Sequence, residues 1–150
     1  MADVVRLSRV LADEMVEHCL QGRPNEACGI LAASNGDITK VFRMTNAAGS
    51  PVRYALDSQE QFAAYKKLEE SDWDLGGVFH SHTRTEAYPS PTDVRLASED
   101  VPYVIVSLAA DPPMIRAFRI VKESLIDDDG RIEEVTVVVE EREGDGASGG

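Results

Sequence analysis

Two histidines, His80 and His82, stand two positions apart in the run Leu75–His82, which has the apolar character of a β-strand. Side chains at positions i and i+2 of a strand project from the same face, so the two imidazoles are expected side by side, where they could bind one divalent metal ion. Asp93 follows eleven residues after His82 and could supply a third, oxygen ligand. Two histidines and one carboxylate with an open fourth position are the ligand set of a catalytic rather than a structural zinc ion.

Each of these residues also has an explanation without a metal. An H-x-H pair by itself is weak evidence for a metal site. Ser90 and Asp93, with Pro91 at the first helical position, fit an ordinary helix-capping box. The joint pattern is more specific: H-x-H is followed by seven residues and then by S-x-x-D, and Glu26 lies upstream in the run Glu26-Ala27-Cys28-Gly29.

This combination resembles the signature of the JAMM, or MPN-plus, metallopeptidases at every signature position. The resemblance implies one JAMM/MPN-like domain of the α/β (α+β) class, a mixed β-sheet flanked by helices. It also implies that His80, His82 and Asp93 bind Zn²⁺, that Glu26 is the general acid/base, and that Ser90 stabilises the tetrahedral intermediate. Zinc lowers the pKa of its water to about 7, so a nearby carboxylate can take the proton and later deliver it to the leaving amine.

The resemblance extends through most of residues 1–121, which look like the actinobacterial Mec-type branch of the family. Members of that branch act with a ubiquitin-like sulfur-carrier protein that ends in Gly-Gly. They hydrolyse the bond between the second glycine and a cysteine, so the resemblance implies release of free cysteine in cysteine biosynthesis. The runs that carry it, besides the signature, are Met44–Ala47, Ser50-Pro51, Tyr54–Asp57 and Thr85–Ser90.

Four other functions remain to be compared with this one. The same metal site could serve an isopeptidase that removes a ubiquitin-like modifier from lysine, or a peptidase that exposes the carrier's Gly-Gly. A non-catalytic MPN-type scaffold belongs to another class, and such modules are expected to have lost ligands that are present here. A zinc deaminase is disfavoured because no P-C-x-x-C segment follows the histidines.

Two further residues near the motif have open roles. The loop Thr83–Pro89 joins the proposed ligands and must border the substrate cleft, where Arg84 could either pair with a substrate carboxylate or point to solvent. Cys28 could be a thiol nucleophile, but a cysteine at the start of an apolar strand is more often a small buried side chain.

The elements that must position these residues follow from hydrophobic periodicity and turn signals. Asn35-Gly36 between two apolar runs favours a hairpin, and Ser58 with Gln61 fits a capping box. We expect a single α/β, sandwich-like domain with a mixed sheet. The predicted helices cover residues 8–21, 58–70 and 90–98, and the predicted strands cover 28–33, 38–44, 52–56, 75–82, 103–109, 115–121 and 135–139.

Charge and composition limit the partners. The 150 residues include 27 acidic and 15 basic side chains, a formal net charge of −12. Such a chain lacks the clustered Lys and Arg that bind nucleic acid or an anionic membrane. Residues 1–121 carry 17 acidic and 12 basic side chains, net −5, whereas residues 122–150 carry 10 and 3, net −7. We therefore expect a domain over residues 1–139 and an acidic, Gly-rich, disordered tail over 140–150.

The cellular compartment is also predicted from composition. Two cysteines are too few for a disulfide framework, and no apolar run approaches the 18 residues of a membrane span or forms a leader. The prediction is a soluble, cytoplasmic protein.

Overall fold

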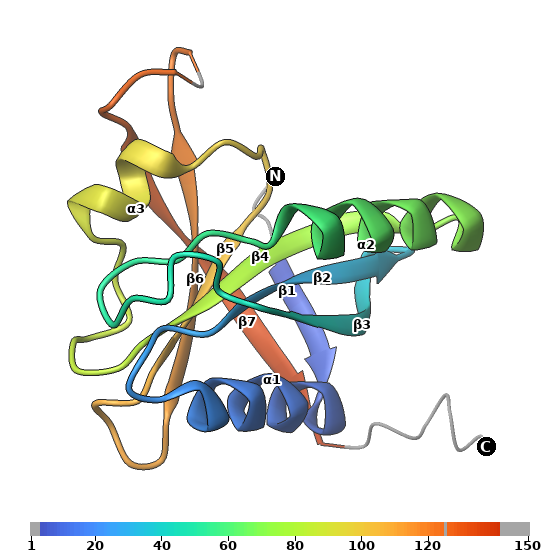
Figure 1. The fold of residues 1–150 in the computed structure, drawn as a ribbon. Coiled ribbons are helices and arrows are strands. Elements are labelled where there is room, and N and C mark those ends of the chain that lie inside the picture. The colour runs from blue at the N-terminus through green and yellow to red at the C-terminus, as the bar shows by residue number, and fades with distance from the viewer. Residues whose placement is uncertain (1–3, 125, 142–150) are drawn as a thin grey trace.

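The β-sheet is the centre of the molecule, seen here in a computed structural model that describes residues 4–124 and 126–141. Within these residues, seven strands close into a barrel in the order β1–β3–β2–β4–β5–β6–β7 (Figure 1). Neighbours are antiparallel except where β1 meets β3 and β7 and where β4 meets β5, so the sheet is mixed, as predicted. The strands are β1 (Val4–Ser8), β2 (Cys28–Ser34), β3 (Asp37–Met44), β4 (Asp74–His82), β5 (Tyr103–Ser107), β6 (Met114–Val121) and β7 (Arg131–Glu140).

Three helices in the described part of the chain flank this sheet: α1 (Arg9–Gly22), α2 (Ser58–Ser71) and α3 (Pro91–Leu96). Figure 1 shows α1 and α2 on opposite sides of β2 and β4. The start of α1 is as predicted, because the Leu11 N–H donates to the Ser8 hydroxyl at 3.1 Å. The predicted class, a single α/β domain with a mixed sheet flanked by helices, is confirmed, but the sheet closes on itself instead of forming a sandwich.

The central strands are buried on both faces. On the α1 side Met15 packs with Phe79, and on the α2 side Leu68 belongs to the same apolar cluster as Val78. Because successive strand residues point to opposite faces, Phe79 and Val78 pack in different layers of the core. This alternation continues to the end of β4 and decides which side chains of the motif face α2.

The predicted strand over residues 52–56 is wrong. These residues form a loop in which Leu56 makes an isolated bridge with Asn46. The Asn46 side chain binds the loop backbone: its Oδ1 accepts from the Ala55 N–H at 3.0 Å and its Nδ2 donates to the Arg53 carbonyl at 3.1 Å. This alternating segment can therefore remain a loop, because the Asn46 side chain satisfies backbone groups that a neighbouring strand would otherwise have bound.

The predicted cap of α2 is also wrong by one residue. Asp57, and not Ser58, is the N-cap, because its carboxylate accepts from the Glu60 N–H at 3.0 Å. The third helix ends at Leu96, earlier than predicted. Beyond it the Ser98 N–H donates to the Tyr103 hydroxyl at 3.0 Å, so the chain already leaves the helix to contact β5.

Strand β1 is absent from the prediction. It pairs in parallel with β7, from Val4 beside Thr136 to Ser8 beside Glu140. A partner about 130 residues away leaves no local signal, since strand pairing at that distance depends on the tertiary fold. Periodicity thus predicts a strand over residues 52–56 that does not form, and it gives no sign of the strand over residues 4–8.

The last described residues belong to the folded domain. Strand β7 reaches Glu140, and Glu141 forms an ion pair with Arg9 at 2.8 Å. Of the tail predicted over 140–150, residues 142–150 lie outside the described residues. None of the described helices has the length and apolar character needed to cross a membrane.

Gly29 provides a test of this packing. A Cβ at this position of β2 would overlap the Phe42 carbonyl oxygen and the Phe79 ring, neither of which is a flexible chain end. We expect Gly29→Ala to lower the free energy of unfolding by about 1–3 kcal/mol in urea titrations, the usual cost of overpacking. Thr39→Ala, on the exposed side of β3, should change it by less than about 0.5 kcal/mol. Equal effects of the two substitutions would contradict this packing.

Candidate metal centre

The end of β4 places two imidazoles on one face. His80 and His82 are 0% and 4% exposed and share the side of the sheet that carries Val78. Ser81 lies between them in sequence and points to the opposite side, so the strand alternation predicted from the sequence is observed. The strand is central, between β2 and β5, and its neighbours fix it on both edges.

Helix α3 supplies the third member of the cluster. The Asp93 N–H donates to the Ser90 hydroxyl oxygen at 3.0 Å, and the Ser90 N–H donates to Asp93 Oδ2 at 2.9 Å. This is the capping box expected from the sequence, with Pro91 at the first helical position. The capping explanation and the metal explanation are compatible, because the box orients the Asp93 carboxylate toward β4.

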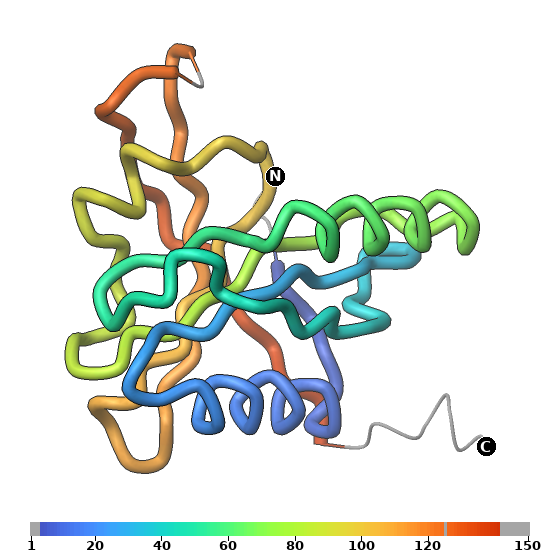
Figure 2. Tube along the Cα trace, viewed as in Figure 1, coloured from blue at the N-terminus to red at the C-terminus, as the bar shows by residue number. Residues whose placement is uncertain are grey.

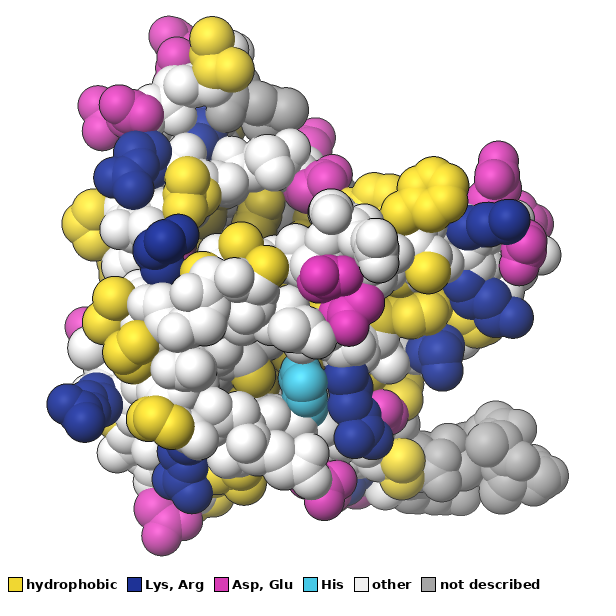
Figure 3. Space-filling model, in the orientation of Figure 1, with side chains coloured by type: hydrophobic (Ala, Val, Ile, Leu, Met, Phe, Trp, Pro, Cys, Tyr) yellow, Lys and Arg dark blue, Asp and Glu magenta, His cyan; other side chains and the backbone are white. Residues whose placement is uncertain are grey.

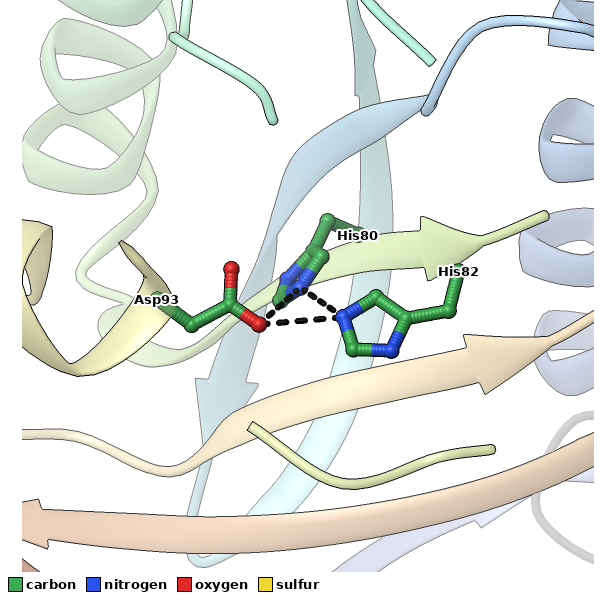
Figure 4. Close-up of side chains that lie close together, drawn as sticks. All are labelled: His80, His82 and Asp93. Carbon is green, nitrogen blue, oxygen red and sulfur yellow. Dashed lines mark hydrogen bonds and ion pairs between the residues drawn. The ribbon is translucent and has the colours of Figure 1, made fainter. Parts of the chain in front are cut away.

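Three potential ligand atoms converge at this point (Figure 4). Asp93 Oδ2 lies 3.2 Å from His80 Nε2 and 3.0 Å from His82 Nε2, and the two Nε2 atoms are 3.2 Å apart. Bonds of about 2.0–2.1 Å to a tetrahedral zinc ion put neighbouring ligand atoms about 3.3 Å apart. The group could therefore hold one metal ion with little rearrangement.

The protonation states favour the same conclusion. His82 Nδ1 lies 2.8 Å from the Glu86 carbonyl, which can only accept, so Nδ1 carries a proton and Nε2 faces Asp93. Although burial opposes it, hydrogen bonds to Asp93 and to the Glu86 carbonyl raise the pKa of His82, so a metal ion would displace a proton shared between Nε2 and Asp93. Burial lowers the pKa of His80, which keeps that ring neutral. Although burial opposes it, hydrogen bonds to His80 and His82 hold the pKa of Asp93 far below its usual range. A neutral imidazole and a carboxylate are the forms that bind a metal ion.

A stacked aromatic ring, and not a second hydrogen bond, orients the His80 imidazole. Its Nδ1 is buried and has no hydrogen-bond partner among the described residues. The Tyr54 ring stacks on the imidazole with centroids 4.4 Å apart and planes at 20°. Most metal-binding histidines are oriented by a hydrogen bond from the other ring nitrogen, as His82 is. For His80 the stacked ring takes that place.

Glu26 lies beside the cluster, on the segment before β2. The Glu26 N–H donates to the Ser50 carbonyl at 2.9 Å, and its side chain is 5% exposed. Its Oε1 has no hydrogen-bond partner in the part of the chain that the structure describes. Burial, with a smaller contribution from the Asp93 charge, raises the pKa of Glu26 to about 8. An unpaired buried carboxylate of this kind is typical of functional sites.

A cavity of about 340 Å³ opens over these residues. Figure 2 shows that the segments that line it, which lie between α1 and β2, between β3 and α2 and between β4 and α3, gather at one end of the molecule. The structure thus brings together all five residues predicted from the sequence. The lining residues are Pro24, Glu26, Pro51, Val52, His82, Thr83, Arg84, Thr85 and Ser90.

Sequence reasoning missed the residues that hold these groups in place. Asn46 binds the carbonyl of Glu26 at 2.9 Å as well as the loop that carries Tyr54. Both residues lie in runs that the family resemblance includes, but nothing in their local pattern marks a role. Cys28 is buried and its thiol lies 3.7 Å from the Thr45 carbonyl; burial raises its pKa to about 12, which fits the predicted structural role.

Comparison with known proteins gives consistent results. A model of the prokaryotic homologues of the JAB domain matches residues 8–121. The CysO-cysteine peptidase of Mycobacterium tuberculosis is 43% identical over 137 residues, which are 88% of each chain. A probable TtuB-protein conjugate cleaving protease of Thermus thermophilus is 34% identical over 103 residues, 68% of this chain and 69% of the relative. The solution structure of a protein from Desulfitobacterium hafniense aligns with a TM-score of 0.79 and 33% identity, covering 91% of this chain and 93% of the other.

The stacked ring of Tyr54 predicts an effect on metal affinity. We expect Tyr54→Leu to weaken Zn²⁺ binding about 10-fold in chelator competition, because His80 loses its orientation, whereas Tyr54→Phe keeps the ring and the affinity. Tyr65→Leu, on α2, is the matched control and should bind as the wild type does. Equal losses in Tyr54→Leu and Tyr54→Phe would show that the ring is not the orienting group.

The raised pKa of Glu26 predicts a pH effect in the metal-free protein. The folded state keeps the Glu26 proton up to about pH 8, whereas the unfolded chain releases it near pH 4.3. Wild-type stability should therefore fall between these values as pH rises, and Glu26→Gln should escape this loss. We expect the thermal midpoint of Glu26→Gln to exceed that of the wild type by a margin that grows from pH 5 to pH 8. A constant margin would contradict the raised pKa.

Proposed function

The chain belongs to the prokaryotic JAB family, and from this we propose that it is a zinc-dependent peptidase that hydrolyses the bond between the Gly-Gly end of a ubiquitin-like sulfur-carrier protein and cysteine. The observation that carries the proposal is the convergence of two imidazoles and a carboxylate beside a buried, unpaired Glu26. The similarity to a CysO-cysteine peptidase supports the choice of substrate.

In this proposal His80, His82 and Asp93 bind the zinc ion. The ion, when bound, supplies the Lewis acidity that polarises a carbonyl group and lowers the pKa of water to about 7. The donor set fits, since two imidazoles that bind through Nε2 and a carboxylate would leave one position open in a tetrahedral site.

Glu26 acts as the general acid/base. Its carboxylate accepts a proton from the attacking water and delivers it to the nitrogen of the leaving cysteine. Burial raises the pKa of Glu26 to about 8 in the metal-free protein, and a zinc ion nearby would lower it toward neutral pH, where a group can perform both steps. The orphaned Oε1 is the atom available for this exchange.

Ser90 stabilises the oxyanion. Its hydroxyl oxygen accepts from the Asp93 N–H, so its own hydrogen remains available to donate. Ser90 lines the cavity together with Glu26, which supports a role for its hydroxyl at the scissile carbonyl. Donors fixed before the reaction stabilise developing charge at no cost of reorganisation.

A second activity has a specific observation in its favour. The Thermus relative is named as a protease that cleaves protein conjugates, which suggests an isopeptidase that acts on a ubiquitin-like modifier joined to lysine. Both reactions break an amide after a carrier's C-terminal glycine, so the same metal site could catalyse either reaction. A non-catalytic scaffold is disfavoured, since all five signature residues are present and lie together. The cytoplasmic location stays a prediction.

The test is release of free cysteine from a purified carrier–Gly-Gly-Cys adduct. We expect zinc-loaded wild type to release cysteine and Glu26→Gln to lose about 10²–10⁴-fold in kcat while it keeps bound zinc, because only proton transfer is removed. Glu70→Gln, exposed on α2, is the matched control.

A carrier linked through Gly-Gly to the ε-amine of lysine is assayed in parallel. Faster cleavage of this substrate would favour the isopeptidase. No cleavage of either substrate by the zinc-loaded wild type would refute the proposed function.

A further inference from the structure

Arg84 is the one permanent cation among the residues that line the cavity over the metal centre. It is exposed, and it lies two positions beyond His82. No hydrogen bond or ion pair of its side chain is found among the described residues. Two arginines elsewhere on the surface are paired with carboxylates: Arg9 pairs with Glu141 and Arg116 pairs with Glu134, each at 2.8 Å.

The backbone next to Arg84 is fixed. The Thr85 carbonyl accepts from the Ser107 hydroxyl at 2.6 Å, and the Glu86 carbonyl accepts from His82 Nδ1 at 2.8 Å. Ala87, one residue further, is 1% exposed and packs in a small apolar cluster. Arg84 therefore extends from a rigid base, so less conformational entropy is lost when its guanidinium binds a ligand.

The charges around the cavity make Arg84 the group that would select an anionic ligand. Glu26 and Asp93 are carboxyl groups at or beside the reaction centre, and residues 1–121 carry a net charge of −5. On the face drawn in Figure 3, Lys and Arg side chains are scattered and do not form a basic patch. An anionic group that enters the cavity away from the metal ligands gains little from the overall field, and Arg84 is the lining residue whose charge would compensate it.

The substrate in the proposed function carries such a group. Hydrolysis breaks the amide C–N bond: the oxygen of water joins the glycine carbonyl carbon, and a proton passes to the cysteine nitrogen. The carboxylate carbon of a C-terminal cysteine is two bonds from that nitrogen, so it must enter the cavity with the scissile bond. At an isopeptide bond the leaving nitrogen is instead followed by four methylenes.

We propose that Arg84 binds the free α-carboxylate of the leaving residue and makes the site selective for a single α-linked amino acid at the end of the carrier. A guanidinium binds a carboxylate through two parallel N–H···O bonds, which fixes the leaving residue as well as neutralising it. This inference rests on the proposed function and adds a specificity-determining residue to it.

The test varies the carboxylate on the substrate and the cation on the enzyme. Carrier–Gly-Gly-Cys with a free carboxylate is compared with the same adduct ending in a carboxamide. We expect Arg84→Ala to lower kcat/KM about 10–100-fold for the carboxylate and less than about 2-fold for the carboxamide. Arg84→Lys, which keeps the charge without the planar fork, should fall between. Lys67→Ala removes an equal charge from the exposed side of α2 and should change neither rate more than about 2-fold.

A binding measurement separates recognition from chemistry. In the Glu26→Gln background, which binds without turnover, calorimetry should show that Arg84→Ala weakens the carboxylate adduct about 10-fold or more and leaves the carboxamide adduct unchanged.

The outcomes distinguish the role of Arg84 from the peptidase activity itself. Equal losses for both substrates, or none, in Arg84→Ala would overturn the role of Arg84 and leave the peptidase intact. If wild type cleaves neither adduct, the proposed function fails and this inference fails with it.

Discussion

The site depends on one reciprocal pair of hydrogen bonds between β4 and the residue before β2. The Ala27 N–H donates to the Ser81 hydroxyl at 2.8 Å, and the Ser81 N–H donates to the Ala27 carbonyl at 3.0 Å. Ser81 lies between the two histidines and points to the other side of the strand. The pair therefore ties Glu26 to His80 and His82 through the backbone, and a buried donor left without its acceptor would cost about 1–3 kcal/mol.

The fold holds three electron-rich atoms of the candidate metal site closer together than they would stay on their own. Three lone-pair atoms lie 3.0–3.2 Å apart in a buried region, where only a proton or a cation between them makes the contact favourable. The Ser90 cap and the Glu86 carbonyl hold two of the three from behind, and the Tyr54 ring holds the third. Because a cation would make the same contact favourable, metal binding and stability are expected to be coupled.

The sequence predicts the reactive groups better than the contacts that orient them. The i, i+2 spacing of His80 and His82 and the Ser90 cap are local, and so they were predicted correctly, as was the hairpin at Asn35, which has φ of 54°. Tyr54 lies in an alternating segment that periodicity assigns to a strand, because periodicity cannot register that the Asn46 side chain binds its backbone. Strand β1 depends on a partner at the other end of the chain. Contacts between distant residues leave no periodic trace, and those contacts bring the site together.

The acidity of the chain limits how it can select a substrate. The charge of −5 over residues 1–121 offers no long-range attraction to an anionic substrate end, and in the proposed function a zinc ion would polarise any scissile carbonyl that reaches it. Selectivity must then come from groups within the cavity. The anchored segment after β4 brings one guanidinium there, that of Arg84, for which no side-chain partner is found among the described residues. In the proposed reaction, a guanidinium that extends from a fixed backbone would distinguish leaving groups by the position of their carboxylate as well as by its charge.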